Sequence, residues 1–295
     1  MISTHMIKKI RQIEIRTRHL VTDSFAGEYH SVFKGHGIEF DEVRPYQPGD
    51  EIRMIDWNVT ARTGVPYVKR YIEERELSIF FVVDASGSQD FGSVQHLKRE
   101  LTAEVAAVLA FAATNNHDKA GLLIFTDQIE LFIPPRKGRK HVLRIVRELL
   151  AFTPTHRGTN LKLALDTINH LLKRRSVIFL VSDFIADTAQ YQRALSITNQ
   201  RHDLIAVELH DPLETTIANV GLLALEDAES GIVTWVDTGN AVWRREFQQK
   251  IIQLNQNRQR AFTQANVDRI RLSTGEDYVA PLLGFFEKRS SRTAR

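Results

Sequence analysis

Short apolar runs alternate with amphipathic stretches along the chain from Ile79 onward. The apolar runs predict strands over residues 79–83, 120–126, 177–181 and 204–209. Each run is rich in β-branched and aromatic residues and has few polar positions, so both of its faces are expected to be buried. Strands of this kind belong to parallel sheets that helices cover on both faces.

Four amphipathic segments between and after these runs predict helices. In the first, apolar residues recur at spacings of three and four from Leu97 to Ala112, so their side chains share one face. The others are expected over residues 138–150, 161–172 and 188–200. The alternation predicts an α/β fold with a mainly parallel, Rossmann-like sheet flanked by helices.

Two segments near the C-terminal end follow different patterns. Residues 221–238 hold two strand-like runs around the turn-forming sequence Glu229-Ser230-Gly231, which predicts an antiparallel hairpin at a sheet edge. Residues 241–264 predict a long polar helix with one buried apolar stripe. This stripe consists of Trp243, Phe247, Ile251, Leu254 and Phe262.

Glycines and prolines punctuate the first 78 residues, which predicts loops and strands and no helix there. They include Gly27, Gly35, Gly37, Pro45, Pro48, Gly49, Gly64 and Pro66. We therefore expect three segments. Residues 1–78 form an N-terminal β/loop extension, residues 79–270 form the α/β domain, and residues 271–295 form a C-terminal segment with a basic tail.

Charged residues are dense in the second half of the N-terminal segment. Asp50, Arg53, Asp56 and Arg62 are expected to form a buried ion-pair network that fastens this segment to the sheet, with Trp57 as a packing anchor. A second binding surface made of the same residues is the alternative.

The composition narrows the class of protein. With 295 residues, 43% of them hydrophobic, the chain can build a conventional core. It has no cysteine, which excludes disulfides, thiolate catalysis and cysteine zinc sites and fits a reducing compartment. Since the sequence shows no signal peptide and no apolar run near the ~18 residues of a membrane span, we expect a cytoplasmic protein.

The formal net charge of +3 is mildly basic, with clusters at residues 8–18, 136–141 and 288–295. Such clusters are typical of solvated helix ends and loops. No aromatic RNA-binding pattern, zinc-finger spacing or helix-turn-helix accompanies them, so we expect no nucleic-acid partner and keep weak nucleic-acid binding as an alternative.

Asp84 is the residue most suggestive of chemistry, because it directly follows the apolar run 79–83. Ligands of open parallel sheets bind beyond the carboxyl ends of the strands. Ser86 and Ser88 add hydroxyl oxygens at alternate positions of the same loop. Magnesium prefers about six oxygen ligands and takes one or two carboxylates from protein, so this loop is a candidate metal site. The pattern alone is weak.

Two further loops offer oxygen ligands at the same predicted edge. Thr159 precedes the helix expected at 161–172, and Asp183 follows the strand expected at 177–181. Each can instead be explained as a cap of the following helix. If the three loops converge, Asp84, Ser86 and Ser88 form one metal site with Thr159 and Asp183.

This set of five residues resembles the metal-ion-dependent adhesion site of von Willebrand factor type A domains. The resemblance covers residues 79–262 and implies a bound divalent ion, Mg²⁺ or Mn²⁺. It implies that Ser86, Ser88 and Thr159 bind the ion directly, that Asp84 and Asp183 often act through water, and that an acidic side chain of a partner protein completes the shell.

The N-terminal segment carries a second resemblance. Residues 35–50, 53–57 and 61–64 are similar to a bacterial family, domain-of-unknown-function family fifty-eight, whose members accompany MoxR-type AAA+ ATPases. The resemblance implies a non-catalytic adaptor or co-chaperone of such an ATPase in complex assembly or metalloenzyme maturation. The ATPase or its protein client would supply the acidic residue.

A magnesium-dependent phosphatase or other hydrolase is the enzymatic alternative. A haloacid-dehalogenase-type phosphatase needs Asp-x-Asp after its first strand, and here Ser86 stands at the second position. The chain has no phosphate loop ending in Gly-Lys-Ser/Thr, no His-Glu-x-x-His and no Gly-x-Ser-x-Gly. An interaction module without catalytic machinery is therefore favoured.

Overall fold

A computed structural model describes residues 4–21, 29, 32–33, 39–72, 77–93 and 97–293. The chain divides into two compact units. Unit 1 comprises Met1–Val32 and Ser78–Arg295, and unit 2 comprises Phe33–Leu77. Residues 35–38, which contribute to the N-terminal resemblance, lie outside the described residues.

Unit 1 is built on a six-stranded sheet with the strand order β10-β7-β6-β3-β4-β5. The strands are β3 (Ser78–Asp84), β4 (Lys119–Phe125), β5 (Ile129–Arg136), β6 (Val177–Ser182), β7 (Asp203–His210) and β10 (Asp268–Ser273). All neighbours are parallel except β4 and β5. This sheet confirms the predicted mainly parallel α/β fold. The four predicted strands are its four central ones.

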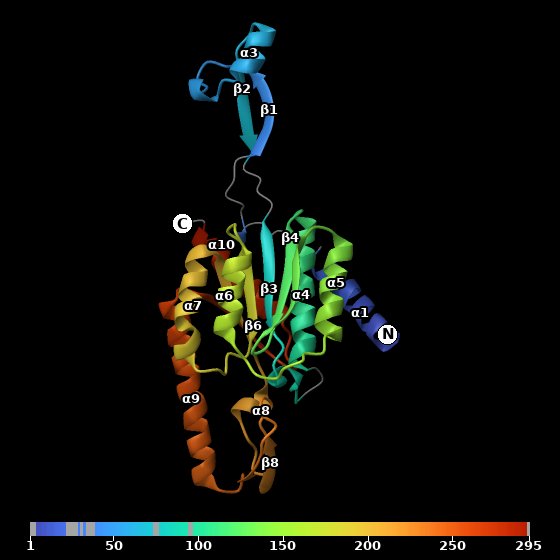
Figure 1. Cartoon of the computed structure of the whole chain (residues 1–295), viewed down its shortest axis with the longest axis vertical. Helices are drawn as coiled ribbons and strands as arrows, with labels where there is room; N and C mark the ends of the chain where they lie inside the picture. Colours follow the sequence, from blue (N-terminus) through green and yellow to red (C-terminus); the bar gives the residue numbers. More distant parts are fainter. Residues whose placement is uncertain are drawn as a thin grey trace. The chain divides into compact units, whose positions relative to one another are not determined.

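Helices cover both faces of the sheet. They are α4 (Lys98–Asn115), α5 (Arg139–Ala151), α6 (Leu161–Leu171), α7 (Thr188–Arg201) and α10 (Val279–Thr293). Figure 1 shows α6 and α7 on one side of the strands and α4 and α5 on the other. The core between the sheet and the α6/α7 layer is apolar and includes Phe80, Leu165 and Leu195, all fully buried. No helix of the described part is long and apolar enough to cross a membrane.

Helix α1 (Thr4–Leu20) corrects the prediction that the first 78 residues contain no helix. Ile13 and Thr17 lie four positions apart and are buried, so they share the inner face of the helix. Arg16 pairs with Glu104 of α4 at 3.5 Å. The prediction was wrong because it averaged the glycine-rich residues after position 26 with a helical start.

Unit 2 is a small antiparallel pair with two short helical segments. Its elements are β1 (Glu39–Pro45), η2 (Ile52–Met54), α3 (Trp57–Thr63) and β2 (Tyr67–Ile72). Strands β1 and β2 pair with each other, with Glu39 opposite Ile72. The side chain of Asp56 caps α3, which ends at Gly64 with a φ of 74°.

Within unit 2, the charged residues form partly buried pairs and not a buried network. Asp50 pairs with Arg44 at 2.7 Å and Asp56 with Lys69 at 3.5 Å, so the acidic residues find partners inside unit 2. These side chains are only partly buried, because a two-stranded ribbon has too little mass to cover them. The side chains of Arg53, Trp57 and Arg62 are exposed. Trp57, at 65% exposure, does not anchor the packing within unit 2.

Strands β8 (Leu222–Glu226) and β9 (Val233–Asp237) form the predicted antiparallel hairpin. The hairpin forms a separate two-stranded sheet, so the prediction that it lies at an edge of the main sheet was wrong. Its alternating residues are too exposed to form part of the core: both Leu222 and Trp235 are more than 60% exposed.

Helix α9 (Ala241–Gln264) follows the hairpin and is longer than the strands of the main sheet. At 1.5 Å per residue it spans about 36 Å, whereas a strand of eight residues spans about 26 Å. Figure 1 shows α9 running past the end of the sheet. Of the stripe predicted to be buried, only Phe262 is buried, and Leu254 is 37% exposed. The rings of Trp243 and Phe247 instead stack on each other, with their centroids 5.5 Å apart.

Candidate metal centre

The loop after β3 brings three of the predicted ligands together. Asp84 is the last residue of β3, and its Oδ1 accepts a hydrogen bond of 2.9 Å from the backbone N–H of Ser86. The hydroxyl oxygens of Ser86 and Ser88 lie 3.1 Å apart. Asp84 and Ser86 are each 2% exposed. One short loop therefore presents a buried carboxylate and two adjacent hydroxyls.

Ser182 links this loop to the neighbouring strand β6. Its hydroxyl donates a 2.7 Å hydrogen bond to Oδ2 of Asp84 and accepts one of 3.0 Å from the N–H of Phe184. Among the described residues, no basic side chain pairs with Asp84. Burial and the negative charge of Asp183 raise the pKa of Asp84 to about 7. A cation in this place would favour the charged carboxylate.

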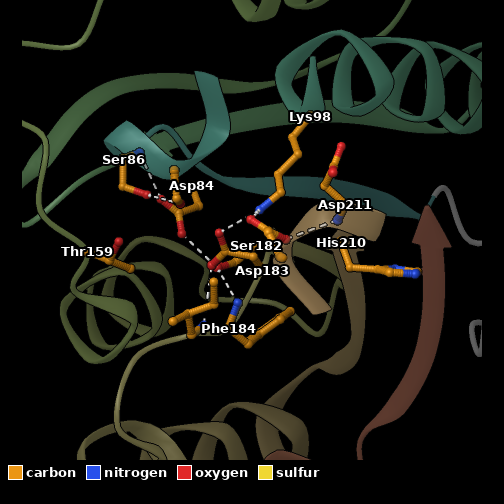
Figure 2. A network of polar contacts seen from close by, with 12 residues as sticks. Asp84, Ser86, Lys98, Thr159, Ser182, Asp183, Phe184, His210 and Asp211 are labelled. Carbon is orange, nitrogen blue, oxygen red and sulfur yellow. Dashed lines mark hydrogen bonds and ion pairs between the residues drawn. The ribbon is translucent and has the colours of Figure 1, made fainter. Parts of the chain in front are cut away.

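Thr159 lies in a loop that is hydrogen-bonded to the Asp84 loop. The N–H of Gly87 donates to the carbonyl of Arg157 at 2.9 Å. Asn160, and not Thr159, caps α6, because its Oδ1 accepts from the N–H of Leu163 at 2.9 Å. The capping explanation for Thr159 is therefore wrong, and its hydroxyl makes a tertiary contact instead. Figure 2 shows Thr159 and Ser86 on the same side of Asp84.

Asp183 follows β6 and has a different environment from Asp84. Its Oδ2 lies 3.1 Å from the ammonium nitrogen of Lys98, which also pairs with Glu214. Lys98 is fully buried. The capping explanation for Asp183 is also wrong, because Asp187 caps α7. The charge of Asp183 is already matched by a cation of the protein itself.

Lys98 is a site residue that the sequence reasoning missed. Burial lowers the pKa of Lys98, but the charges of Asp183 and Glu214 outweigh it and raise the pKa above its ordinary value. These partners lie 85 and 116 positions away along the chain. The one local signal was a lysine at the first residue of a helix, where the helix dipole disfavours a positive charge.

The backbone after Asp183 is held in an unfavourable conformation. Phe184 has a φ of 53°, in the left-handed region that non-glycine residues rarely adopt. Its buried ring packs edge-on against Phe262 of α9, with the ring centroids 5.0 Å apart. Arg258 of α9 donates to the carbonyl of Asp183 at 2.6 Å. Contacts from α9 thus hold the backbone at Asp183 and Phe184.

The tip of the β8–β9 hairpin also contacts these loops, which the sequence analysis did not foresee. The Thr159 hydroxyl donates a 2.5 Å hydrogen bond to Oε1 of Glu229. A Cβ atom at Gly87 would overlap the carbonyl oxygen of Ala228, so only glycine fits there. From the sequence alone, Glu229 was predicted to be a turn residue.

The donors gathered here are carboxylate and hydroxyl oxygens, which suit a hard divalent cation. Asp84, Ser86 and Ser88 share one loop, Thr159 stands in a loop bonded to it, and Asp183 is tied to Lys98. The described residues contain no cluster of three or more His, Cys, Asp and Glu side chains that could hold a metal ion. Any ion bound here would therefore depend on the hydroxyls.

Comparison with known protein sequences gives a match along most of the chain. The family described as "Protein of unknown function DUF58" matches residues 42–258. The "Uncharacterized protein Rv1480" of Mycobacterium tuberculosis (strain ATCC 25618 / H37Rv) is 30% identical over 282 residues, which cover 95% of this chain and 88% of the relative. The family match includes residues of both units.

The solved structures that match this chain include two of low sequence identity. The BatB protein of Bacteroides thetaiotaomicron has a TM-score of 0.48 and 13% identity, covering 73% of this chain and 99% of that chain. The SpRpn10 VWA domain has a TM-score of 0.42 and 9% identity, covering 71% of this chain and 94% of that chain.

Proposed function

Because this chain belongs to the DUF58 family, we propose that it is a non-catalytic protein-interaction module that binds its partner through a divalent cation. The ion is Mg²⁺ or Mn²⁺. The hydroxyls of Ser86, Ser88 and Thr159 bind it directly, and Asp84 and Asp183 act directly or through water. When bound, the ion supplies a Lewis-acid centre that takes up a carboxylate of the partner.

The convergence of three loops carries this proposal. The Gly87 N–H bonds to Arg157 at 2.9 Å, and the Ser182 hydroxyl bonds to Asp84 at 2.7 Å. The first bond joins the loop after β3 to the loop before α6, and the second joins the carboxyl ends of β6 and β3. Three oxygen-bearing loops at one sheet edge are what ligand binding beyond the carboxyl ends of parallel strands requires.

The charge of Asp84 gives further support. A buried carboxylate without a cation is costly, as its raised pKa of about 7 reflects. Asp183 has Lys98 as its counter-ion, whereas among the described residues Asp84 has only hydrogen-bond donors. A divalent ion beside Asp84 would offset that cost.

We infer that the partner is a MoxR-type AAA+ ATPase or its protein client, with an aspartate or glutamate that reaches the ion. The support is the resemblance of the N-terminal segment to family members that accompany such ATPases. The process is complex assembly or metalloenzyme maturation. A phosphatase is less favoured, because Ser86 occupies the position where a second carboxylate is needed.

Thermal and urea unfolding with and without Mg²⁺ test the metal site. At a hundredfold excess over the dissociation constant, Mg²⁺ is expected to stabilise the wild-type chain by about 2.7 kcal/mol. Asp84→Asn should lose this response without unfolding. Asp166→Asn is the matched control, because its exposed carboxylate pairs with Lys162 of the same helix. A wild-type chain that does not respond, or an Asp84→Asn chain that responds like it, contradicts the proposal.

The same proteins test the partner. The tagged chain is incubated with native cell extract in Mg²⁺ or in chelator, and bound proteins are identified by mass spectrometry. A MoxR-type ATPase or a client retained by the wild type only with Mg²⁺, and lost from Asp84→Asn, is the expected result. Retention in both conditions would move the interface away from the ion. Magnesium-dependent turnover of a phosphate ester that Asp84→Asn abolishes would favour the hydrolase.

A further inference from the structure

The turn between β8 and β9 is fixed by its own hydrogen bonds. Oδ1 of Asp227 accepts from the N–H and the hydroxyl of Ser230, each at 2.7 Å, and from the N–H of Glu229 at 3.2 Å. Gly231, with a φ of 70°, donates its N–H to the carbonyl of Asp227 at 2.8 Å. The turn therefore presents Glu229 in one direction without help from a ligand.

That direction leads to the loops proposed to hold the ion. The Glu229 carboxylate accepts from the Thr159 hydroxyl at 2.5 Å, across 70 positions of sequence. Beside it, the carbonyl of Ala228 packs against Gly87, where any side chain would collide with it. Gly87 stands between the two serine ligands. The tip thus contacts two of the three loops at once.

We propose that Glu229 is an internal acidic ligand of the metal centre, which takes the coordination position that the carboxylate of a partner would otherwise occupy. This inference rests on the proposed function, because it requires an ion at Ser86, Ser88 and Thr159. In the closed state the hairpin shields the ion. A partner that carries an aspartate or glutamate binds only when the hairpin tip leaves.

The distance between the two oxygens agrees with this role. In an octahedral magnesium site with bonds of about 2.1 Å, adjacent ligand oxygens lie roughly 3 Å apart. Oε1 of Glu229 and Oγ1 of Thr159 are therefore close enough to occupy neighbouring positions around one ion. The hydroxyl has lone pairs for the cation while its O–H still donates the hydrogen bond to the carboxylate. The same contact can thus persist in the ion-bound state.

With a hairpin that can close over the ion, the affinity for the partner depends on the fraction of molecules in which the hairpin is open. If only a fraction of molecules is open, the apparent affinity for the partner falls by that fraction. A hairpin that is open in one molecule in ten would weaken the partner's binding about tenfold. The acidic residue of the partner must then bind better than Glu229 does, which selects partners with further contacts.

Manganese is the probe for this inference, because its bound water molecules accelerate the relaxation of water protons. The wild-type chain, Glu229→Gln and Asp84→Asn are titrated with Mn²⁺. The heat of binding and the relaxation rate of water protons are measured during each titration. Glu226→Gln is the matched control: it makes the same charge change at an exposed position of the same hairpin. Glu229→Gln is expected to bind Mn²⁺ roughly tenfold or more weakly than wild type.

The relaxation rate of water protons shows whether Glu229 binds the ion directly or acts only as a nearby negative charge. Loss of the Glu229 carboxylate opens one coordination position to water, so relaxation per bound ion should be faster in Glu229→Gln than in wild type and Glu226→Gln. Acetate should then slow relaxation in Glu229→Gln at concentrations that leave wild type unchanged, because a free carboxylate refills the open position.

The outcomes distinguish the two proposals. If wild type does not bind Mn²⁺, or Asp84→Asn binds it equally well, the proposed function is wrong and this inference falls with it. If wild type binds the ion through Asp84 but Glu229→Gln matches Glu226→Gln in affinity and relaxation, only the internal ligand is overturned.

Discussion

At the scale of single residues, the buried ammonium of Lys98 explains how the carboxylates of Asp183 and Glu214 are tolerated close together. It lies 3.1 Å from Asp183 and also pairs with Glu214, which is only partly buried. A charge taken out of water requires such partners, since unpaired burial costs several kcal/mol. Lys98 therefore neutralises Asp183 and leaves Asp84 as the carboxylate without a cation among the described residues.

Replacement of Lys98 tests this division of charge. Lys98→Met keeps much of the side-chain volume but leaves Asp183 and Glu214 without their cation, so we expect a loss of about 3–5 kcal/mol in the free energy of unfolding. Urea denaturation measures it. Lys162→Met, which removes an exposed pair with Asp166, is the control and should cost no more than about 0.5 kcal/mol. A loss below about 1 kcal/mol in Lys98→Met would show that the pair is not needed.

Local sequence was sufficient for some site residues and not for others. Asp84, Ser86 and Ser88 were predictable because one loop holds all three directly after an apolar strand. Their role as ligands stays a prediction. Lys98 and Glu229 were not predictable, since their contacts join positions 70 or more apart and depend on how the elements pack.

At the scale of elements, the strands that are buried on both faces were the ones that could be predicted from the sequence. The four central strands are continuous apolar runs, and the pattern found them within one or two residues. The edge strands β5 and β10 were missed because each has an exposed face with interleaved polar residues, and β5 also holds Pro134 and Pro135. Helix α9 was found, but its burial was overestimated because periodicity does not show where the sheet ends.

The junction of α7 and β7 makes stability depend on pH through His202. This side chain is 2% exposed, and burial, followed by the charges of Arg201 and Arg175, lowers its pKa. Below about pH 6.5 the unfolded chain takes up a proton there that the folded chain does not. The contribution of neutral His202 is therefore complete above pH 6.5 and is lost as the pH falls through its lowered folded-state pKa.

His202→Phe removes this proton without adding a buried polar group. We expect the stability of the variant relative to wild type to rise by about 1 kcal/mol between pH 7.5 and pH 5.5, as measured by urea denaturation at each pH. Other titrating groups are common to both proteins, so they cancel in the difference. A difference that does not change with pH would mean that His202 is protonated alike in both states.

At the scale of the whole molecule, the chain leaves unit 1 and returns to it through the two strands of unit 2. Glu39 and Ile72 are directly opposed in the β1–β2 pair, and opposed residues of antiparallel strands have Cα atoms about 4.5–5.5 Å apart. A short linker can therefore replace residues 39–72 without stretching the chain. Unit 2 also carries exposed apolar side chains, among them Ile52 and Trp57, each more than 60% exposed.

Excision of unit 2 would separate the proposed metal centre from the exposed apolar side chains of unit 2. With residues 39–72 replaced by Gly-Ser-Gly, we expect the remaining chain to unfold cooperatively, within about 1 kcal/mol of the full chain, because unit 1 has a buried apolar core of its own. The response to Mg²⁺ should persist, since every proposed ligand lies in unit 1. Circular dichroism in urea, with and without Mg²⁺, measures both the stability and the response to Mg²⁺.

An unfolded product would show that unit 1 depends on unit 2. A folded, magnesium-responsive product that no longer retains the partner would place partner choice in unit 2 and leave the metal centre to tighten a contact made elsewhere.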